Sequence, residues 1–209
     1  MTKEKALKIF EALSDLYPEA RAELHFSNPF ETLIATMLSA QCTDKRVNMV
    51  TETLFRDYPD AKSYLALTQE QLESRIRECG LYRMKAKHIL EACEILVKDY
   101  DGQVPSTRKE LMSLPGVGQK TAGVVLLAAF GDDQIPVDTH VFRVSNRIGI
   151  AKANTPDKVE IQLRDIIPEG ERSKTHHLLI WHGRRICHAR HPECEKCPLH
   201  NGLCEKNLD

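Results

Sequence analysis

Residues 107–130 read TRKELMSLPGVGQKTAGVVLLAAF, and this stretch decides the fold. Ser106 or Thr107 is the expected cap of a short helix that continues through Met112, and the apolar run that ends at Phe130 predicts a longer one. Between them Pro115 fixes one backbone angle, while Gly116 and Gly118 allow conformations and close approaches that a side chain would block. The stretch therefore predicts two helices joined by a tight turn.

The second helix of this pair begins directly after the turn. Its free backbone N–H groups and the positive end of its dipole then face the turn, a geometry that binds phosphate. Glycines that serve only to make a tight turn are the alternative. The Pro-Gly-x-Gly order, the apolar lead-in and the following Lys120 favour a helix–hairpin–helix that clamps a DNA backbone. Such a clamp positions a duplex without reading its sequence.

The rest of the chain also reads as helical, which predicts an all-α protein. Pro136 in the best strand candidate, IPVDTHV, favours a loop that leads into a helix. Capping residues, prolines at first turns and glycines at the ends set the other helices. We expect these helices to begin after Asn28, at Thr43 or Asp44, after Thr68, at about Met84, at Thr155 and at about Arg172.

Length and composition limit the class of protein. The 209 residues can form one large core or two modest domains. The longest apolar run, Ala122–Phe130, covers nine residues, whereas a membrane-spanning helix needs about twenty. The N-terminal MTKEKALKIF lacks the apolar core of a signal peptide. We therefore expect a cytoplasmic protein that has no membrane partner. We also expect it to be a monomer and, through a function on DNA, to be associated with the nucleoid.

The net charge of −1 means that any surface for DNA must be local. Residues 172–191 qualify, because they contain five lysines or arginines, five histidines and no acidic residue. A solvated basic face is the alternative explanation of such a block.

Lys120 and Asp138 are the candidate reactive residues. Lys120 falls in the first turn of a helix, where the dipole disfavours its charged form, and partial burial would add to this effect. A neutral amine is a nucleophile that can form a Schiff base with a sugar carbon. An exposed lysine that contacts phosphate is the alternative. Asp138 could assist proton transfer and stabilise positive charge at the sugar, or it could simply cap a helix.

Four of the seven cysteines are spaced Cys187-x6-Cys194-x2-Cys197-x6-Cys204. This compact set indicates a metal centre rather than four free thiols. Zinc sites generally use two close pairs, whereas an iron–sulfur cluster accepts one close pair with two distant single cysteines. The spacing alone leaves both metals open.

Taken together, the motifs resemble the endonuclease III family of helix–hairpin–helix DNA glycosylases. The similarity covers nearly the whole chain. It is carried in order by NPFETL, LSAQ, GLY, LPGVGQKTA, VDTHVFRVSNR, HHLLIWHGRRIC and the terminal cysteines.

The resemblance implies two all-α domains with a DNA-binding cleft between them. A helical-barrel domain would span residues 22–132, and residues 1–21 and 133–209 would form a domain with a [4Fe–4S] cluster on the four cysteines. Lys120 would attack C1′ of an oxidised pyrimidine nucleotide flipped out of double-stranded DNA, with help from Asp138, and β-elimination would cut the strand on the 3′ side. Gln41 and Leu81 would fill the vacated stack. The further DNA contacts implied are Gly116, Val117, Gly118, Thr121, His140, Arg143, Arg184 and Arg185.

Two positions depart from the family pattern. The last cysteine interval has six residues where five are usual, and we expect the additional residue to bulge out of a loop beside Asn201-Gly202. Gly123 stands where asparagine is common, which affects substrate preference or rate more than the type of reaction.

Two other functions fit parts of the sequence. An adenine mismatch glycosylase of the same superfamily would use water as nucleophile and would not need Lys120. A non-catalytic helix–hairpin–helix DNA-binding module would need neither Lys120 nor Asp138.

Overall fold

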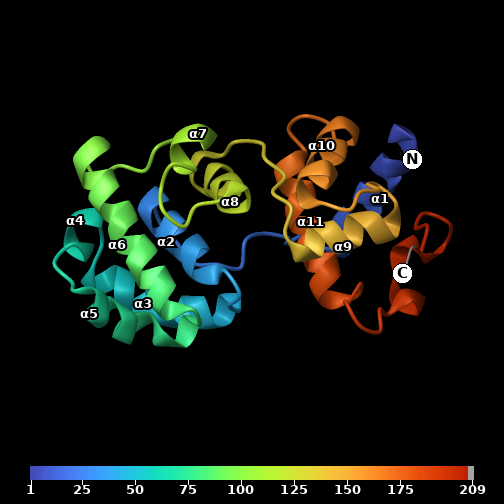
Figure 1. Ribbon diagram of the computed structural model, residues 1–209. Coiled ribbons are helices and arrows are strands. Elements are labelled where there is room, and N and C mark those ends of the chain that lie inside the picture. Colours follow the sequence, from blue (N-terminus) through green and yellow to red (C-terminus); the bar gives the residue numbers. More distant parts are fainter. Residues whose placement is uncertain (207–209) are drawn as a thin grey trace. The chain divides into compact units, whose positions relative to one another are not determined.

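The computed structural model describes residues 1–206, and every regular element in that range is helical (Figure 1). The all-α prediction is therefore confirmed. The chain divides into two compact units. The central unit is Ala22–Asp132, and the terminal unit combines Met1–Arg21 with Asp133–Asp209. Within the described range no helix is long and apolar enough to cross a membrane.

The central unit is built around one almost completely buried helix, α2, Pro29–Ser39. Phe30 and all seven residues from Thr32 to Leu38 are buried. The other elements of the unit are α3 (Asp44–Asp57), α4 (Ala61–Tyr64), α5 (Gln69–Ile76), the 3₁₀ helix η1 (Arg77–Cys79), α6 (Tyr82–Asp99), α7 (Arg108–Leu111) and α8 (Gln119–Phe130).

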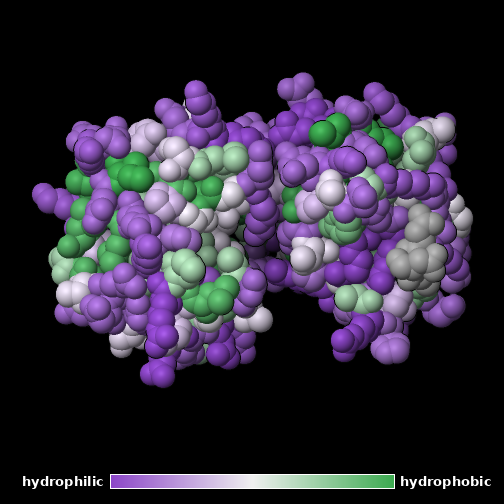
Figure 2. Space-filling model, in the orientation of Figure 1, coloured by the Kyte–Doolittle hydropathy of each residue, from purple (hydrophilic) through white to green (hydrophobic). Residues whose placement is uncertain are grey.

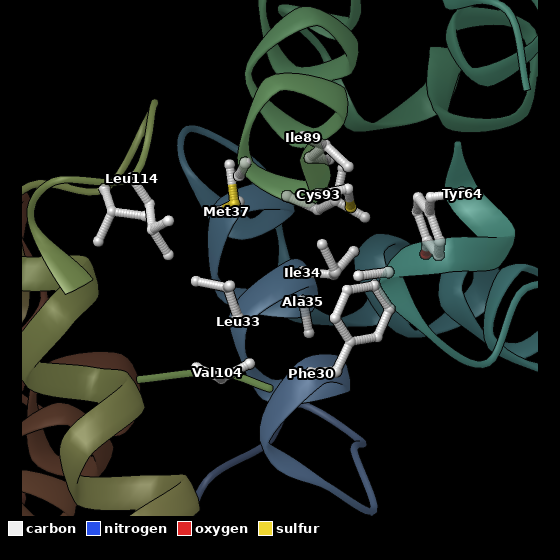
Figure 3. Packing of buried hydrophobic residues seen from close by; sticks show 14 of the residues in the cluster. Phe30, Leu33, Ile34, Ala35, Met37, Tyr64, Ile89, Cys93, Val104 and Leu114 are labelled. Carbon is white, nitrogen blue, oxygen red and sulfur yellow. The ribbon is translucent and has the colours of Figure 1, made fainter. Parts of the chain in front are cut away.

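Local sequence starts α2 and apolar packing holds it in place. The Asn28 side chain accepts a hydrogen bond from the Glu31 backbone N–H, and proline occupies the first helical position. Figure 3 shows Ile34 of this helix pointing toward Cys93 and Ile89 of α6. The helix also lies against α8 and α3. A helix that is apolar on nearly all sides must be covered on all sides, and its neighbours in this unit cover it.

The terminal unit has a separate core. Its elements are α1 (Lys3–Leu16), α9 (Thr139–Ile148), α10 (Pro156–Ile166), α11 (Arg172–Arg185), η2 (Cys194–Lys196) and η3 (Pro198–His200). The buried side chains of α1 and α9 meet those of α11, with Leu199 of η3 at the edge. The surface seen in Figure 2 is mostly hydrophilic, with small hydrophobic areas.

Several helix bounds differ from those read in the sequence. The helix expected from about Met84 begins at Tyr82, because Leu81 already serves as its N-terminal flanking residue. A short helix, α4, was not expected, although Asp60 and Ser63 form a reciprocal capping box around it. The IPVDTHV stretch is a loop that leads into α9, as the sequence indicated.

Candidate functional site

The hairpin of the central unit joins α7 to α8 through residues 112–118. Gly116 has a φ of 76°, in the region that favours glycine, and the Val117 N–H donates to the Leu114 carbonyl at 3.1 Å. A Cβ atom on Gly116 would lie 3.0 Å from the Cβ of His88 on α6. Buried Val117 anchors the turn from the inside. The glycine is therefore needed both for its conformation and for the close approach of α6.

The N-terminus of α8 has no side-chain cap. Gly118 occupies the N-cap position, so its missing side chain leaves the first N–H groups of the helix to other partners. Thr121, in this first turn, is partly exposed. The arrangement suits an anion, since the positive end of the dipole and free backbone donors meet at one place.

Lys120 is the second residue of α8, and its side chain is exposed. The partial burial considered from the sequence is therefore absent. Beside it, the Arg108 guanidinium donates to the Gln119 side chain at 3.0 Å, which ties α7 to the start of α8. The buried Gly123 lies one turn further along the same helix.

Gln41 and Leu81 lie in the central unit on two separate turns. Their φ angles are 54° and 46°, which is unusual for residues other than glycine. Both side chains are exposed, and 58% of the Leu81 surface is accessible to solvent. Leu81 is therefore an apolar residue of an exposed turn and does not belong to the core.

Asp138 belongs to the terminal unit and caps α9. Its Oδ1 atom accepts hydrogen bonds from the backbone N–H groups of His140 and Val141, each at 2.8 Å. The capping function considered from the sequence is therefore real. Within residues 1–206 the other carboxylate oxygen has no hydrogen-bond partner, so one face of the group is held and the other is available. Capping fixes the carboxylate without using both of its oxygens.

Arg143 and His140 lie where α9 crosses α11. The Arg143 guanidinium donates to the carbonyls of Gly183 and Cys187, at 2.9 Å and 3.1 Å, and its Nη2 lies 3.2 Å from the Nδ1 of His140. A Cβ atom on Gly183 would lie 3.1 Å from both side chains. Burial lowers the pKa of His140. Arg143 therefore holds the segment that begins the cysteine loop, a task that the sequence did not reveal.

The other two arginines predicted to contact DNA lie at the end of α11. Arg184 is partly exposed, and Arg185 is exposed with its guanidinium carbon 3.7 Å from the centre of the Trp181 ring. This cation–π contact holds the Arg185 head group in a defined place.

The four C-terminal cysteines line a single cavity of about 30 Å³ in the terminal unit. Among residues 1–206, no three histidine, cysteine, aspartate or glutamate side chains are grouped closely enough to hold a single metal ion. Burial raises the pKa of the Cys197 and Cys204 thiols. Buried thiolates therefore need a compensating cation, which a metal centre supplies.

Sequence reasoning missed two residues of this cavity, Arg147 and His182. Arg147, one turn after Arg143 on α9, donates to the Ala189 carbonyl at 3.0 Å and lies 3.8 Å from the Cys187 sulfur. Burial lowers the pKa of His182 to about 4, and its Nε2 lies 3.5 Å from the Cys197 sulfur. Neither residue had a local signal in the sequence, because the partners of both lie 15 to 165 residues away along the chain.

The long interval between Cys197 and Cys204 is taken up by a compact turn. It contains η3 and Gly202, whose φ is 86°. The Cys204 N–H donates to the Leu199 carbonyl at 2.9 Å, which brings the last cysteine back to the loop. Asn201 and Gly202, beside which the additional residue was expected to bulge out, lie in this turn.

Comparison with known proteins agrees with this geometry. Residues 34–169 match the HhH-GPD superfamily of base excision DNA repair proteins. The chain is 48% identical over 192 residues to endonuclease III of Rickettsia felis, which covers 92% of the chain and 90% of the relative. It is 49% identical over 188 residues to endonuclease III of Bacillus subtilis, with 90% and 86% covered.

Solved structures give the same result. A trapped covalent intermediate of endonuclease III with DNA, an estranged-adenine complex, matches with a TM-score of 0.94 at 48% identity. It covers 99% of this chain and 97% of the other. A non-covalent endonuclease III–DNA complex matches with a TM-score of 0.95 at 47% identity, with 99% and 96% covered.

The fold and the hairpin therefore define a helix–hairpin–helix DNA glycosylase. The chain belongs to the HhH-GPD superfamily of base excision DNA repair proteins. The resemblance to endonuclease III seen in the sequence is confirmed, and with it the enzyme class, a DNA glycosylase with AP lyase activity.

The strained glycine of the hairpin gives a testable consequence. We expect Gly116→Ala to lower the free energy of unfolding by about 1–2 kcal/mol, because alanine resists a positive φ, and by more if His88 cannot move. Urea denaturation of the two proteins measures the difference. Gly118→Ala is the matched control, since its φ is −94° and nothing lies within 4 Å of the added Cβ. Equal losses in the two variants would contradict this account of the turn.

Proposed function

We propose that this chain removes oxidised or ring-saturated pyrimidines from double-stranded DNA and cuts the strand on the 3′ side of the resulting abasic site. The observation that carries the proposal is the exposed Lys120 amine at the uncapped N-terminus of α8, beside the hairpin. Phosphates bound at that helix end would hold the backbone next to an amine. A relative at 48% identity has been trapped in a covalent intermediate with DNA.

The chemistry assigned to Lys120 begins with a neutral amine. Its Nζ forms a bond to C1′ of the damaged nucleotide as the bond from C1′ to the base breaks, and the base leaves with a proton. The bond from C1′ to the ring oxygen then breaks, the ring oxygen takes up a proton, and the nitrogen, which keeps its remaining proton, forms a protonated Schiff base with C1′. Removal of a proton from C2′ then expels the 3′ phosphate, which completes β-elimination.

Asp138 is the carboxylate that assists this reaction. Its capping bonds to His140 and Val141 fix the group, while its other oxygen has no partner among the described residues. A fixed carboxylate stabilises the positive charge that develops at the sugar and can take up the amine proton. Because capping sets its orientation in advance, the carboxylate need not be reorganised during the reaction.

Gln41 and Leu81 are the residues that fill the stack when the damaged base leaves it. Their exposure, and the backbone strain that presents them, support this assignment. An apolar side chain inserted between bases offsets part of the lost stacking. Within the terminal unit, Arg184 and Arg185 supply positive charge for the backbone.

The four cysteines fit a [4Fe–4S] cluster better than a single zinc ion. Their thiols line one cavity, and their spacing has one close pair with two distant single cysteines instead of two close pairs. A cluster spreads its four thiolates around a larger body than one tetrahedral zinc does. Cys187, Cys194, Cys197 and Cys204 would hold it, and bound iron would supply positive charge to the buried thiolates. We assign the cluster a structural function, the ordering of the Arg184–Arg190 segment, in a monomeric enzyme.

The nucleophile is tested by borohydride trapping. Lys120→Ala should give no covalent complex with a duplex that contains a ring-saturated pyrimidine, because no amine is left to form the reducible Schiff base. It should still bind that duplex in a gel-shift assay. Lys158→Ala, an exposed lysine of α10, is the control and should trap like the unchanged protein. Absence of trapping in the unchanged protein would favour the adenine mismatch glycosylase or the binding module instead.

The assisting carboxylate is tested by comparing two variants. Asp138→Asn keeps an oxygen that can cap α9, so it should remain as stable as the unchanged protein while base excision slows by about 10²–10⁴-fold. Asp138→Ala should show the same slowing and also lose about 1 kcal/mol of stability with the cap. Single-turnover excision and thermal unfolding give the two readouts. Normal excision by Asp138→Asn would exclude the assigned function of the carboxylate.

The metal centre is tested by elemental analysis of the purified protein. We expect about four irons per chain and broad visible absorption. Cys194→Ser should lose both signals, because it removes one of the four ligands, while Cys42→Ser of the central unit should retain them. A colourless protein with one zinc would contradict the cluster assignment.

A further inference from the structure

Lys85 of α6 is a buried lysine that the reaction described above does not use. Only 7% of its surface is exposed, although lysine is almost never buried without partners. Burial lowers the pKa of its amine. A charged group kept in such a place must make interactions that offset the loss of water.

The Lys85 amine binds two helix ends. Its Nζ donates to the carbonyl of Leu38, in the last turn of α2, and to the carbonyl of Cys79, the last residue of η1. Both distances are 2.7 Å. Carbonyls at the C-terminal end of a helix have no partner within the helix and carry partial negative charge, so an ammonium group suits them. One side chain thus joins two helix ends that are 41 residues apart in sequence.

Each of these helix ends leads directly to one of the two exposed, strained residues. Gln41 follows Leu38 by three residues, and Leu81 follows Cys79 by two. Both have positive φ, which persists only when the surrounding structure imposes it. The Lys85 N–H also donates to the Leu81 carbonyl at 3.0 Å, in the first turn of α6. The side chain of Lys85 therefore contacts both turns, and its backbone N–H contacts the Leu81 turn only.

A second pair of residues, Cys79 and Cys42, also connects the two turns. The Cys42 thiol lies near the Cys79 thiol and, after burial, helps to raise its pKa, and Cys42 directly follows Gln41. Burial raises the pKa of Cys79 to about 12. A neutral thiol pair makes this a weak contact, so the two charge-assisted bonds of Lys85 are the stronger connection.

We propose that Lys85 is a positioning residue that holds the Gln41 and Leu81 turns at a fixed separation, so that both side chains enter the DNA stack together. The inference rests on the proposed function, which assigns those two residues to the vacated stack. Gln41 and Leu81 then act as two wedges, and the distance between them must match one opened base step. The Lys85 amine sets that distance, because it binds the helix ends that lead to both residues. Lys85 itself does not touch the DNA.

The test removes the Lys85 amine and measures whether the resulting loss of excision depends on Gln41 and Leu81. Lys85→Met keeps the length of the side chain without its donors, and Lys98→Met is the matched control. Lys98 is exposed on the same helix, thirteen residues or about 20 Å away. The substrate is a duplex with one ring-saturated thymine and 2-aminopurine as the opposite base. Single-turnover excision measures chemistry, and 2-aminopurine emission measures opening of the stack.

We expect Lys85→Met to slow excision on the order of tenfold to a hundredfold and to reduce the emission change. Lys98→Met should change neither. Added to the double variant Gln41→Ala/Leu81→Ala, the Lys85→Met change should cause little further loss, because both side chains that Lys85 positions are already gone. A merely structural effect would instead multiply with that of the double variant. Lys85→Gln, which keeps an N–H donor, should be intermediate and takes the place of Lys85→Met if that variant does not fold.

The outcomes separate this inference from the proposed function. If the unchanged protein excises the base but Lys85→Met and Lys85→Gln match its rate, the positioning function is wrong and the proposed function stands. Losses that multiply with those of Gln41→Ala/Leu81→Ala also overturn the positioning function. If the unchanged protein neither excises the base nor traps abasic DNA, the proposed function is wrong and the inference fails with it.

Discussion

Helix ends leave backbone N–H and C=O groups without partners, and this constraint determines where the functional residues of the chain lie. At α8 the N-cap residue is a glycine, which has no side chain to cap the first N–H groups, so these groups can bind a phosphate. At α9 the Asp138 carboxylate caps with one oxygen and keeps the other free of partners in the described chain. At the ends of α2 and η1 a buried amine takes the carbonyls. The unpaired backbone groups are thus left open at α8, capped by a carboxylate at α9, and bound by an amine at α2 and η1. Each arrangement gives its helix end a different chemical property.

The same constraint explains how a chain with a net charge of −1 can bind a polyanion. Contacts made by helix N-termini and backbone N–H groups need no excess of lysine or arginine. Several arginines of the terminal unit are used to hold backbone, as Arg143 and Arg147 do around the start of the cysteine loop. Positive charge is therefore partly structural in this unit, and net charge is a poor guide to its partner.

Much of the fold could be predicted from the sequence, because the signals are local. Proline after Asn28, glycine after Cys79 and the Pro-Gly-x-Gly turn act within a few residues, and helices form where these signals place them. The hairpin and the clustered cysteines could be recognised for the same reason. Lys85, Arg147 and His182 could not, since their partners are 6 to 47, 40 to 42 and 15 to 165 residues away. A lysine in a helix reads as a surface residue until its long-range contacts are known.

Trp181 is the only tryptophan of the chain, and it lies wholly within the terminal unit. Its indole N–H donates to the Arg21 carbonyl at 3.0 Å, and its ring lies against Arg185 and edge-on to Tyr17. Intrinsic fluorescence excited at the red edge of protein absorption therefore comes from one unit alone. Far-ultraviolet circular dichroism, by contrast, sums the helices of both. The two spectroscopies together can distinguish loss of the terminal core from loss of the central one.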